Sequence, residues 1–112
     1  MQDHKDWTYN KNNFSDLPLI VKDLHDNDQH YINIIDPAIS TTTGYLPYDD
    51  GLLNDVFIKY FNSSENLVGK VWPGNTVFPD FTHPNATKWW SSMALNFHKA
   101  VQFDGIWIVK II

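Results

Sequence analysis

The sequence contains no cysteine and no arginine, and Glu65 is the one glutamate among its 13 acidic residues. Without cysteine, the chain can form neither a disulfide framework nor a thiolate metal site. All 8 basic residues are lysines, they form no basic stripe, and the formal net charge is −5. This balance argues against nucleic acid as a partner. No apolar run reaches the ~18 residues of a membrane helix, so we expect no membrane segment in this chain.

Several motifs of catalysis and targeting are also missing. The histidines form no His-x-x-x-His pair, and there is neither a Gly-x-Ser-x-Gly elbow nor a phosphate-binding glycine loop, so we predict no metal site and no cofactor. The amino terminus lacks a signal-peptide core. A cytosolic chain fits this, and a fragment of a larger secreted protein fits equally well. Three sequons, at Asn13, Asn62 and Asn85, are candidate glycosylation sites and mildly favour a secretory origin.

Aromatic residues, in contrast, are plentiful: they make up 15% of the chain and include five tryptophans. Tryptophan is favoured where a protein grips a sugar or another flat apolar face. Packing in the core is the alternative for any single tryptophan, and it is the default interpretation of Trp89 and Trp90, which fit a helical stripe.

Apolar residues at a 3.6-residue spacing predict two helices. The first is capped by Ser15 or Asp16, has Pro18 in its first turn and ends at residues 25–28. The second is capped by Thr82 or His83, with Pro84 in its first turn. The apolar face of the second helix consists of Ala86, Trp89, Trp90, Met93, Phe97, Ala100 and Val101.

Two apolar runs, at residues 30–35 and 106–112, are rich in β-branched residues and typical of strands buried on both faces of a parallel sheet. Asp36-Pro37 ends the first of these strands. Residues 41–54 are predicted to be a long, turn-rich loop. Short strands are then expected at residues 56–60 and 67–71, joined as a hairpin across residues 62–64, followed by an extended segment at 77–81.

This order of helix, strand, loop, helix and strand predicts an α/β fold with right-handed crossovers. Two parallel strands do not make a domain, because such sheets need both faces covered. We therefore interpret residues 1–112 as an incomplete arc of a (β/α)8 TIM barrel, consisting of two β/α units with a long inserted loop. A typical barrel has ~250 residues, so the chain holds less than half of one.

Chemistry in such barrels takes place at the carboxyl ends of the strands, which here fall at Asp36 and Val109. Asp36 either hydrogen-bonds a ligand or caps the following turn, and its spacing does not decide between the two. Val109 has no group that could break a bond. Asp104 lies at the amino end of its strand and is interpreted as a turn residue.

Taken together, the motifs resemble the catalytic barrel of family-31 glycoside hydrolases, especially the maltase-glucoamylase and sucrase-isomaltase group. The resemblance covers residues 1–108. It rests on an ordered series: Lys5-Asp6-Trp7-Thr8, Asp23-Leu24-His25, Ile34-Ile35-Asp36-Pro37-Ala38-Ile39-Ser40, Val71-Trp72-Pro73-Gly74, Val77-Phe78-Pro79-Asp80-Phe81, Trp89-Trp90 and Phe103-Asp104-Gly105-Ile106-Trp107-Ile108.

The resemblance implies retaining hydrolysis of terminal α-linked glucose from maltose and starch oligosaccharides, by an enzyme of the secretory pathway or the cell-surface membrane. An α-glucoside or malto-oligosaccharide is accordingly the expected partner. By position, Asp36 resembles the acid that hydrogen-bonds the hydroxyls of the terminal glucose. Ile34, Trp72 and Trp107 resemble the apolar walls of the same pocket.

The sequence departs from the family at the nucleophile. The family continues Trp-Ile-Asp-Met-Asn-Glu, whereas here Trp107-Ile108 is followed by Val109. We expect that the family's acid/base aspartate, which comes from a later strand, is absent. The leading hypothesis is a truncated α-glucosidase-like product without hydrolytic activity of its own. The alternatives are a non-catalytic carbohydrate-binding remnant and an excerpt of a complete, active α-glucosidase.

Overall fold

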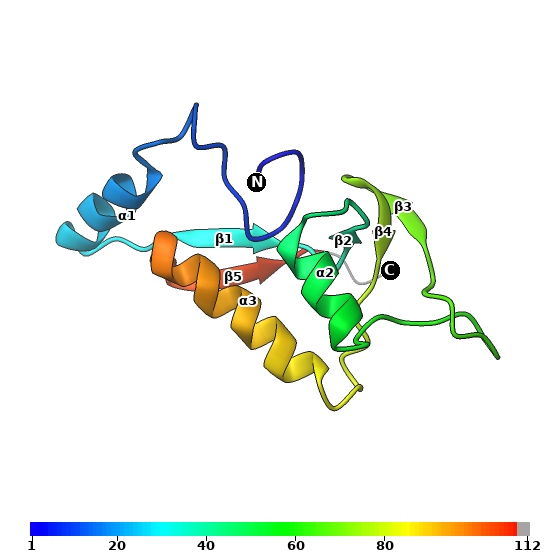
Figure 1. Ribbon diagram of the computed structural model, residues 1–112. Helices are drawn as coiled ribbons and strands as arrows, with labels where there is room; N and C mark the ends of the chain where they lie inside the picture. The colour runs from blue at the N-terminus through cyan, green and yellow to red at the C-terminus, as the bar shows by residue number, and fades with distance from the viewer. Residues whose placement is uncertain (110–112) are drawn as a thin grey trace.

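A two-stranded parallel sheet runs along the middle of the molecule in the computed structural model, which describes residues 1–109 (Figure 1). Its strands are β1 (Ile32–Ile35) and β5 (Gly105–Ile108), paired residue for residue from first to last. The predicted parallel pairing is confirmed. Both strands are shorter than expected, because β1 begins two residues later than predicted and β5 ends at Ile108. The predicted strand residues 110–112 lie outside the described residues.

The two predicted helices are present as α1 (Leu17–Asp26) and α3 (Ala86–Ala100), and Pro18 occupies the first turn of α1 as expected. The predicted start of α3 was wrong by about one turn. Its N-cap residue is Asn85, so Pro84 precedes the helix instead of lying within it. The ring of His83 still contributes to the start, because its Nδ1 accepts a hydrogen bond of 3.2 Å from the Asn85 N–H.

The core lies between α3 and the sheet. Trp89, Met93 and Phe97 form the buried stripe of α3, and Val21 of α1 and Ile35 of β1 belong to the same hydrophobic cluster. Trp89 is only 2% exposed, so its interpretation as a packing residue is confirmed. Trp90 is half-buried, and it stacks edge-on against Trp7 with ring centroids 5.2 Å apart.

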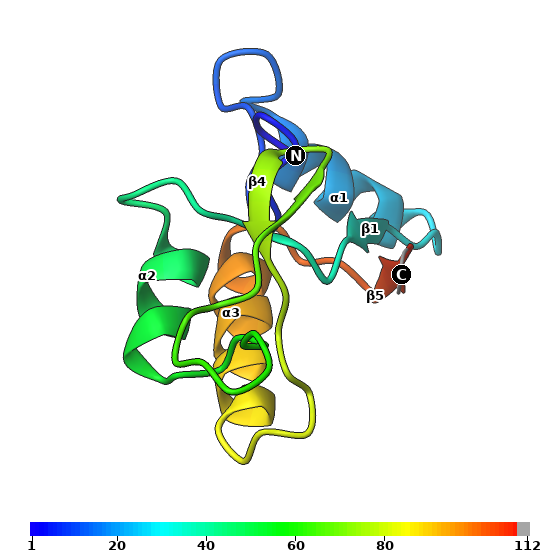
Figure 2. The same ribbon diagram turned by 90° about the vertical axis from the view of Figure 1, so that its right-hand side faces the viewer.

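The prediction of an unbroken loop at residues 41–54 was wrong, because these residues include the helix α2 (Leu46–Leu53). A glycine and a proline inside a short segment without an apolar stripe had favoured turns. In the structure, the proline Pro47 lies in the first turn, where it costs no hydrogen bond. Gly51 faces the ring of Phe57, which leaves no room for a Cβ atom. Figure 2 shows α2 lying beside α3.

A second sheet, which the sequence did not predict, is antiparallel and has the order β2-β4-β3. Its strands are β2 (Ile39–Ser40), β3 (Gly69–Val71) and β4 (Gly74–Val77). The predicted strands at 56–60 and 67–71 are thus replaced by isolated bridges and the short β3. The hairpin across residues 62–64 is nevertheless formed, since the Leu67 N–H donates to the Ile58 carbonyl at 2.7 Å.

The two sheets form no closed barrel within residues 1–109, and the expectation of strands buried on both faces was wrong for this chain. Trp107 on β5 is 59% exposed, because no further strand or helix of the described chain covers that face. The radius of gyration is 15.1 Å, above the roughly 13 Å expected for a compact domain of 100 residues. Of the helices in residues 1–109, none has the length and apolar character required to cross a membrane.

Candidate functional site

A cavity of about 630 Å³ lies at the carboxyl end of the parallel sheet. Asp36 and Val109 both line it, and each directly follows the last registered pair of the sheet, Ile35 and Ile108. Trp72, in the turn between β3 and β4, lines the same cavity. The antiparallel hairpin therefore brings a tryptophan to the strand ends where the sequence had placed an acid and a valine.

The wall of the cavity is mostly apolar. Its residues are Asp36, Pro37, Ala38, Ile58, Leu67, Gly69, Lys70, Val71, Trp72, Phe78, Pro79, Phe81 and Val109. Asp36 and Lys70 are the two charged residues of this lining. An apolar wall with a few polar groups, in a volume of several hundred Å³, is typical of a small-molecule site.

The other two predicted pocket residues lie elsewhere. Ile34 and Trp107 are paired across the parallel sheet, and their side chains share one face of it. That face is exposed, with Ile34 at 38% and Trp107 at 59%, and neither residue lines the cavity. The structure thus unites Asp36 and Trp72 with Val109 and leaves Ile34 and Trp107 as a separate apolar pair below the strand ends.

Asp36 is held by a residue that the sequence had shown only as part of a motif. The Asp36 N–H donates a hydrogen bond of 2.9 Å to Oδ1 of Asp6, whose side chain is buried. The pKa of Asp6 is raised to about 8, chiefly by burial; the hydrogen bond from the Asp36 N–H lowers it, and the negative charge of the Asp36 carboxyl raises it. No local pattern reveals this contact, because it joins residues thirty positions apart.

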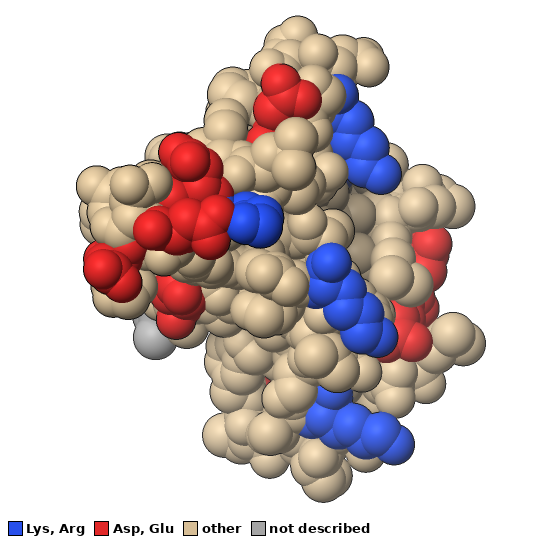
Figure 3. All heavy atoms as spheres, turned by 90° about the vertical axis from the view of Figure 1, so that its left-hand side faces the viewer, with Lys and Arg blue, Asp and Glu red and all other residues tan. Residues whose placement is uncertain are grey.

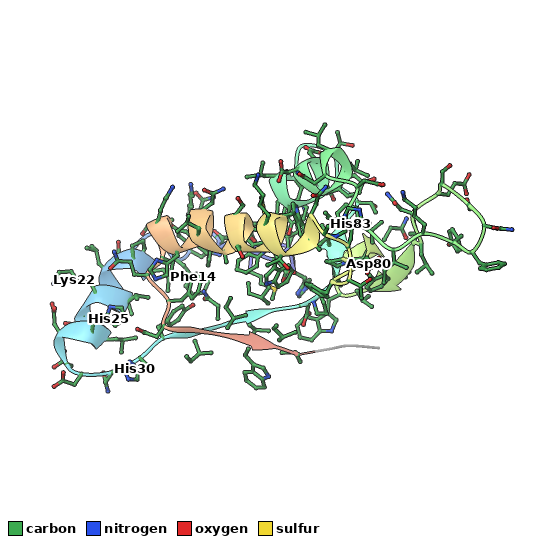
Figure 4. All side chains as sticks on the ribbon, turned by 90° about the horizontal axis from the view of Figure 1, so that it is seen from below. Phe14, Lys22, His25, His30, Asp80 and His83 are labelled. Carbon is green, nitrogen blue, oxygen red and sulfur yellow. The ribbon has the colours of Figure 1, made fainter. Side chains whose placement is uncertain are left out.

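Asp104 is a turn residue at the amino end of β5, as predicted. Its Oδ2 accepts a 2.8 Å bond from the Tyr31 N–H and lies 2.7 Å from Nε2 of His25. These two contacts lower the pKa of the Asp104 carboxyl. His25 and His30 lie together at this end of the molecule, whereas Asp80 and His83 lie at the other end (Figure 4). Asp104 therefore ties α1 and β1 to β5 and is absent from the cavity lining.

All three sequon asparagines are exposed. The side-chain amide of Asn85 donates a 3.2 Å bond to the Asn54 carbonyl, which ties the start of α3 to the end of α2. Glycosylation at Asn13, Asn62 or Asn85 stays a prediction.

No group of three or more potential ligands is arranged for a metal ion in residues 1–109. On the face shown in Figure 3, several acidic side chains form a group on the left, further ones lie apart from it, and the lysines are spread over the face.

The comparison with protein families identifies the lineage. Residues 1–109 match the family described as "Glycosyl hydrolases family 31 TIM-barrel domain". The chain belongs to glycosyl hydrolase family 31. The predicted resemblance is therefore confirmed, and the fold is a partial piece of the α/β barrel domain of that family.

Relatives from this family are α-glucosidases and related enzymes. The chain is 47% identical over 111 residues to the lysosomal alpha-glucosidase of Bos taurus, covering 96% of this chain and 12% of that protein. It is 46% identical over 113 residues to the intestinal sucrase-isomaltase of Homo sapiens, covering 96% of this chain and 6% of that protein. The chain thus spans about one eighth of the bovine enzyme and less of the human one.

Solved structures of family members share the fold of this chain. A Family 31 alpha-glucosidase from Bacteroides thetaiotaomicron superposes with a TM-score of 0.76 at 34% identity, over 94% of this chain and 18% of the enzyme. A glucosidase II alpha subunit superposes with a TM-score of 0.86 at 26% identity, over 96% of this chain and 12% of the subunit. Both superpositions match this chain to a small part of a much larger enzyme.

Proposed function

We propose that the chain is the glucose-holding part of an α-glucosidase-like barrel and that it carries no nucleophile of its own. The observation that supports this proposal best is the shared cavity of Asp36, Trp72 and Val109 at the ends of two parallel strands. The names of the relatives, lysosomal alpha-glucosidase and sucrase-isomaltase, indicate α-glucosides as the substrate class.

In this proposal, Asp36 accepts hydrogen bonds from hydroxyls of the terminal glucose, and the ring of Trp72 lies against its apolar face. Oδ1 of Asp36 is buried, so Oδ2 is the carboxyl oxygen that Asp36 offers as an acceptor for a sugar hydroxyl. Aromatic rings contribute a large apolar surface at little cost in conformational entropy. The hydroxyls and the C–H face of a sugar need these two kinds of group, and the cavity is lined by one of each.

The covalent step needs a different group. A retaining glycosidase attacks the anomeric carbon with a carboxylate oxygen, while a second carboxyl group protonates the leaving oxygen. Val109 occupies the strand end beside Asp36, and its isopropyl group has no lone pair to donate. We therefore infer that the residue at the position of the nucleophile cannot form the glycosyl-enzyme bond.

Because Asp36 and Trp72 line one cavity, the structure supports the alternative in which the chain binds a carbohydrate without cleaving it. Titration with maltose is expected to change the tryptophan fluorescence in a saturable way, because Trp72 lines the cavity. The substitution Asp36→Ala should weaken binding about tenfold or more, since it removes a charge-assisted hydrogen bond of about 1.5–3 kcal/mol.

Asp23→Ala is the matched control for this titration. Asp23 is exposed on α1 and is absent from the cavity lining, so its loss should leave the maltose affinity unchanged. A fluorescence change that is not saturable, or one that Asp36→Ala and Asp23→Ala affect equally, would contradict the proposal.

A further inference from the structure

Asp6 is the most deeply buried carboxyl group in the described part of the chain, with 1% of its surface exposed. Its Oδ1 accepts the hydrogen bond from the Asp36 N–H, and its backbone carbonyl accepts a 2.9 Å hydrogen bond from the Tyr45 hydroxyl. One residue of the amino-terminal segment thus connects the end of β1 with the segment that leads into α2. Burying a carboxyl group is costly unless hydrogen bonds compensate, so these contacts call for an explanation.

We propose that Asp6 is a positioning residue for Asp36, which it holds at the mouth of the cavity through the Asp36 N–H. This proposal rests on the sugar-binding role proposed above for Asp36. Pro37 follows Asp36 directly and restricts its backbone from the other side. With its N–H bonded to Asp6 and its carbonyl joined to a proline, Asp36 has little freedom to turn away from a bound sugar.

The protonated form of Asp6 suits this role. Two charged groups act on its pKa, the Asp36 carboxyl at the end of β1 and the amino-terminal ammonium group of Met1. The third titratable group that faces it is the Tyr45 hydroxyl before α2, whose own pKa is raised by burial and by Asp6. With its pKa raised to about 8, chiefly by burial, Asp6 is mostly neutral at pH 7. A neutral carboxyl group can accept the Asp36 N–H without placing a second negative charge beside the Asp36 carboxyl.

Two oxygen atoms without partners fit the same explanation. Oδ2 of Asp6 and Oδ1 of Asp36 are both buried, and neither has a hydrogen-bond partner within residues 1–109. Two ionised carboxylates offer only acceptors, so they could not satisfy one another. A proton on Asp6 Oδ2 is the donor that such a pair lacks, and Asp36 Oδ1 is an acceptor with no other donor. A protonated Asp6 therefore places a donor among these buried acceptors, which two ionised carboxylates would not.

The test compares Asp6→Ala with Asp6→Asn, because asparagine keeps a neutral acceptor oxygen and alanine does not. Asp3→Asn, at an exposed position of the same segment, is the matched control. Amide hydrogen exchange at Asp36, followed by NMR, reports the contact without any sugar. We expect exchange to accelerate about five- to tenfold in Asp6→Ala, in line with one lost hydrogen bond. In Asp6→Asn and Asp3→Asn it should change less than twofold.

Maltose titration of the same variants gives the second readout. Asp6→Ala should bind about tenfold more weakly, and Asp6→Asn should bind as the wild type does. If Asp6→Ala fails to fold, the Asp6→Asn variant decides. Slow amide exchange at Asp36 together with wild-type maltose affinity in this variant supports the proposal. Fast exchange or weakened maltose binding in this variant overturns it. Rapid exchange at Asp36 in the wild type also overturns it. Slow exchange without maltose binding by the wild type supports the Asp6–Asp36 link and refutes the proposed sugar-binding function instead.

Discussion

Replacing Trp89 with alanine is expected to remove a large part of the free energy of unfolding, whereas replacing Trp72 with alanine should leave it almost unchanged. Trp89 is 2% exposed, and its ring packs against those of Phe57 and Trp90, with centroids 5.8 Å away in each case. Truncating a buried tryptophan costs about 3–5 kcal/mol. The free energy of unfolding of a domain is only about 5–15 kcal/mol, so a loss of this size is a large fraction of it.

Trp72 is the matched control, because it is 62% exposed and its ring contacts that of His4 at 5.8 Å. A substitution at such a position should change the free energy of unfolding by about 0.5 kcal/mol or less. Urea unfolding followed by far-UV circular dichroism measures both variants. Equal losses of stability at Trp72 and Trp89 would contradict the division into a packing tryptophan and a cavity tryptophan.

The stability of the chain should fall as the pH rises from about 4 to about 8, and Asp6→Asn should remove this fall. The pKa of Asp6 is raised from 3.8 to about 8 in the folded chain, chiefly by burial. Across this window the unfolded chain releases a proton that the folded chain retains. Ionisation therefore favours the unfolded state increasingly, by at most about 1.4 kcal/mol for each pH unit.

Other carboxyl groups act in the opposite direction at lower pH. The pKa values of Asp80 and Asp104 are lowered by hydrogen bonds from their neighbours, so their stabilising contribution is lost as the pH falls below about 4. Thermal melts of the wild type, Asp6→Asn and the control Asp3→Asn between pH 5 and pH 8 isolate the Asp6 contribution. Melting curves of the wild type and Asp6→Asn that shift in parallel with pH would refute a buried, protonated Asp6.

Patterns within short segments of the sequence predicted individual helices and strands. The 3.6-residue stripe of α3 and the β-branched run at β5 both mark structure that short segments specify. The parallel pairing followed from the crossover order. Asp104 could be assigned to a turn because it directly precedes a glycine at the start of a strand. These features need only spacing and side-chain type.

The features that the sequence did not reveal depend on distant contacts. The helix α2 contains Gly51, a poor helix former, and the close approach of Phe57 accounts for that glycine. The antiparallel sheet pairs β2 with β4, which lies more than thirty residues further along the chain. Asp6 looks like an ordinary exposed acid in a polar segment, and only its contact with Asp36 distinguishes it.

The sequence predicted only part of the candidate site, because some of its residues are brought together by distant contacts. Asp36 was marked because Asp36-Pro37 stops the apolar run of β1. Val109 was named as a strand end although the predicted strand continued to residue 112, whereas β5 ends at Ile108. The family resemblance, and not the spacing, assigned Ile34, Trp72 and Trp107 to the pocket. Of these, Trp72 lines the cavity, whereas Ile34 and Trp107 lie on an exposed sheet face that the described chain does not cover.

The absence of a nucleophile at Val109 can be tested most directly with a chromogenic α-glucoside. The purified chain and its Val109→Ala variant are incubated with the glucoside beside a family-31 enzyme as positive control, and intact mass spectrometry follows the polypeptide. We predict that the chain releases no more chromophore than Val109→Ala and gains no glucosyl adduct. Release above that of the variant, or a glucosyl group trapped on this polypeptide, would contradict the proposal.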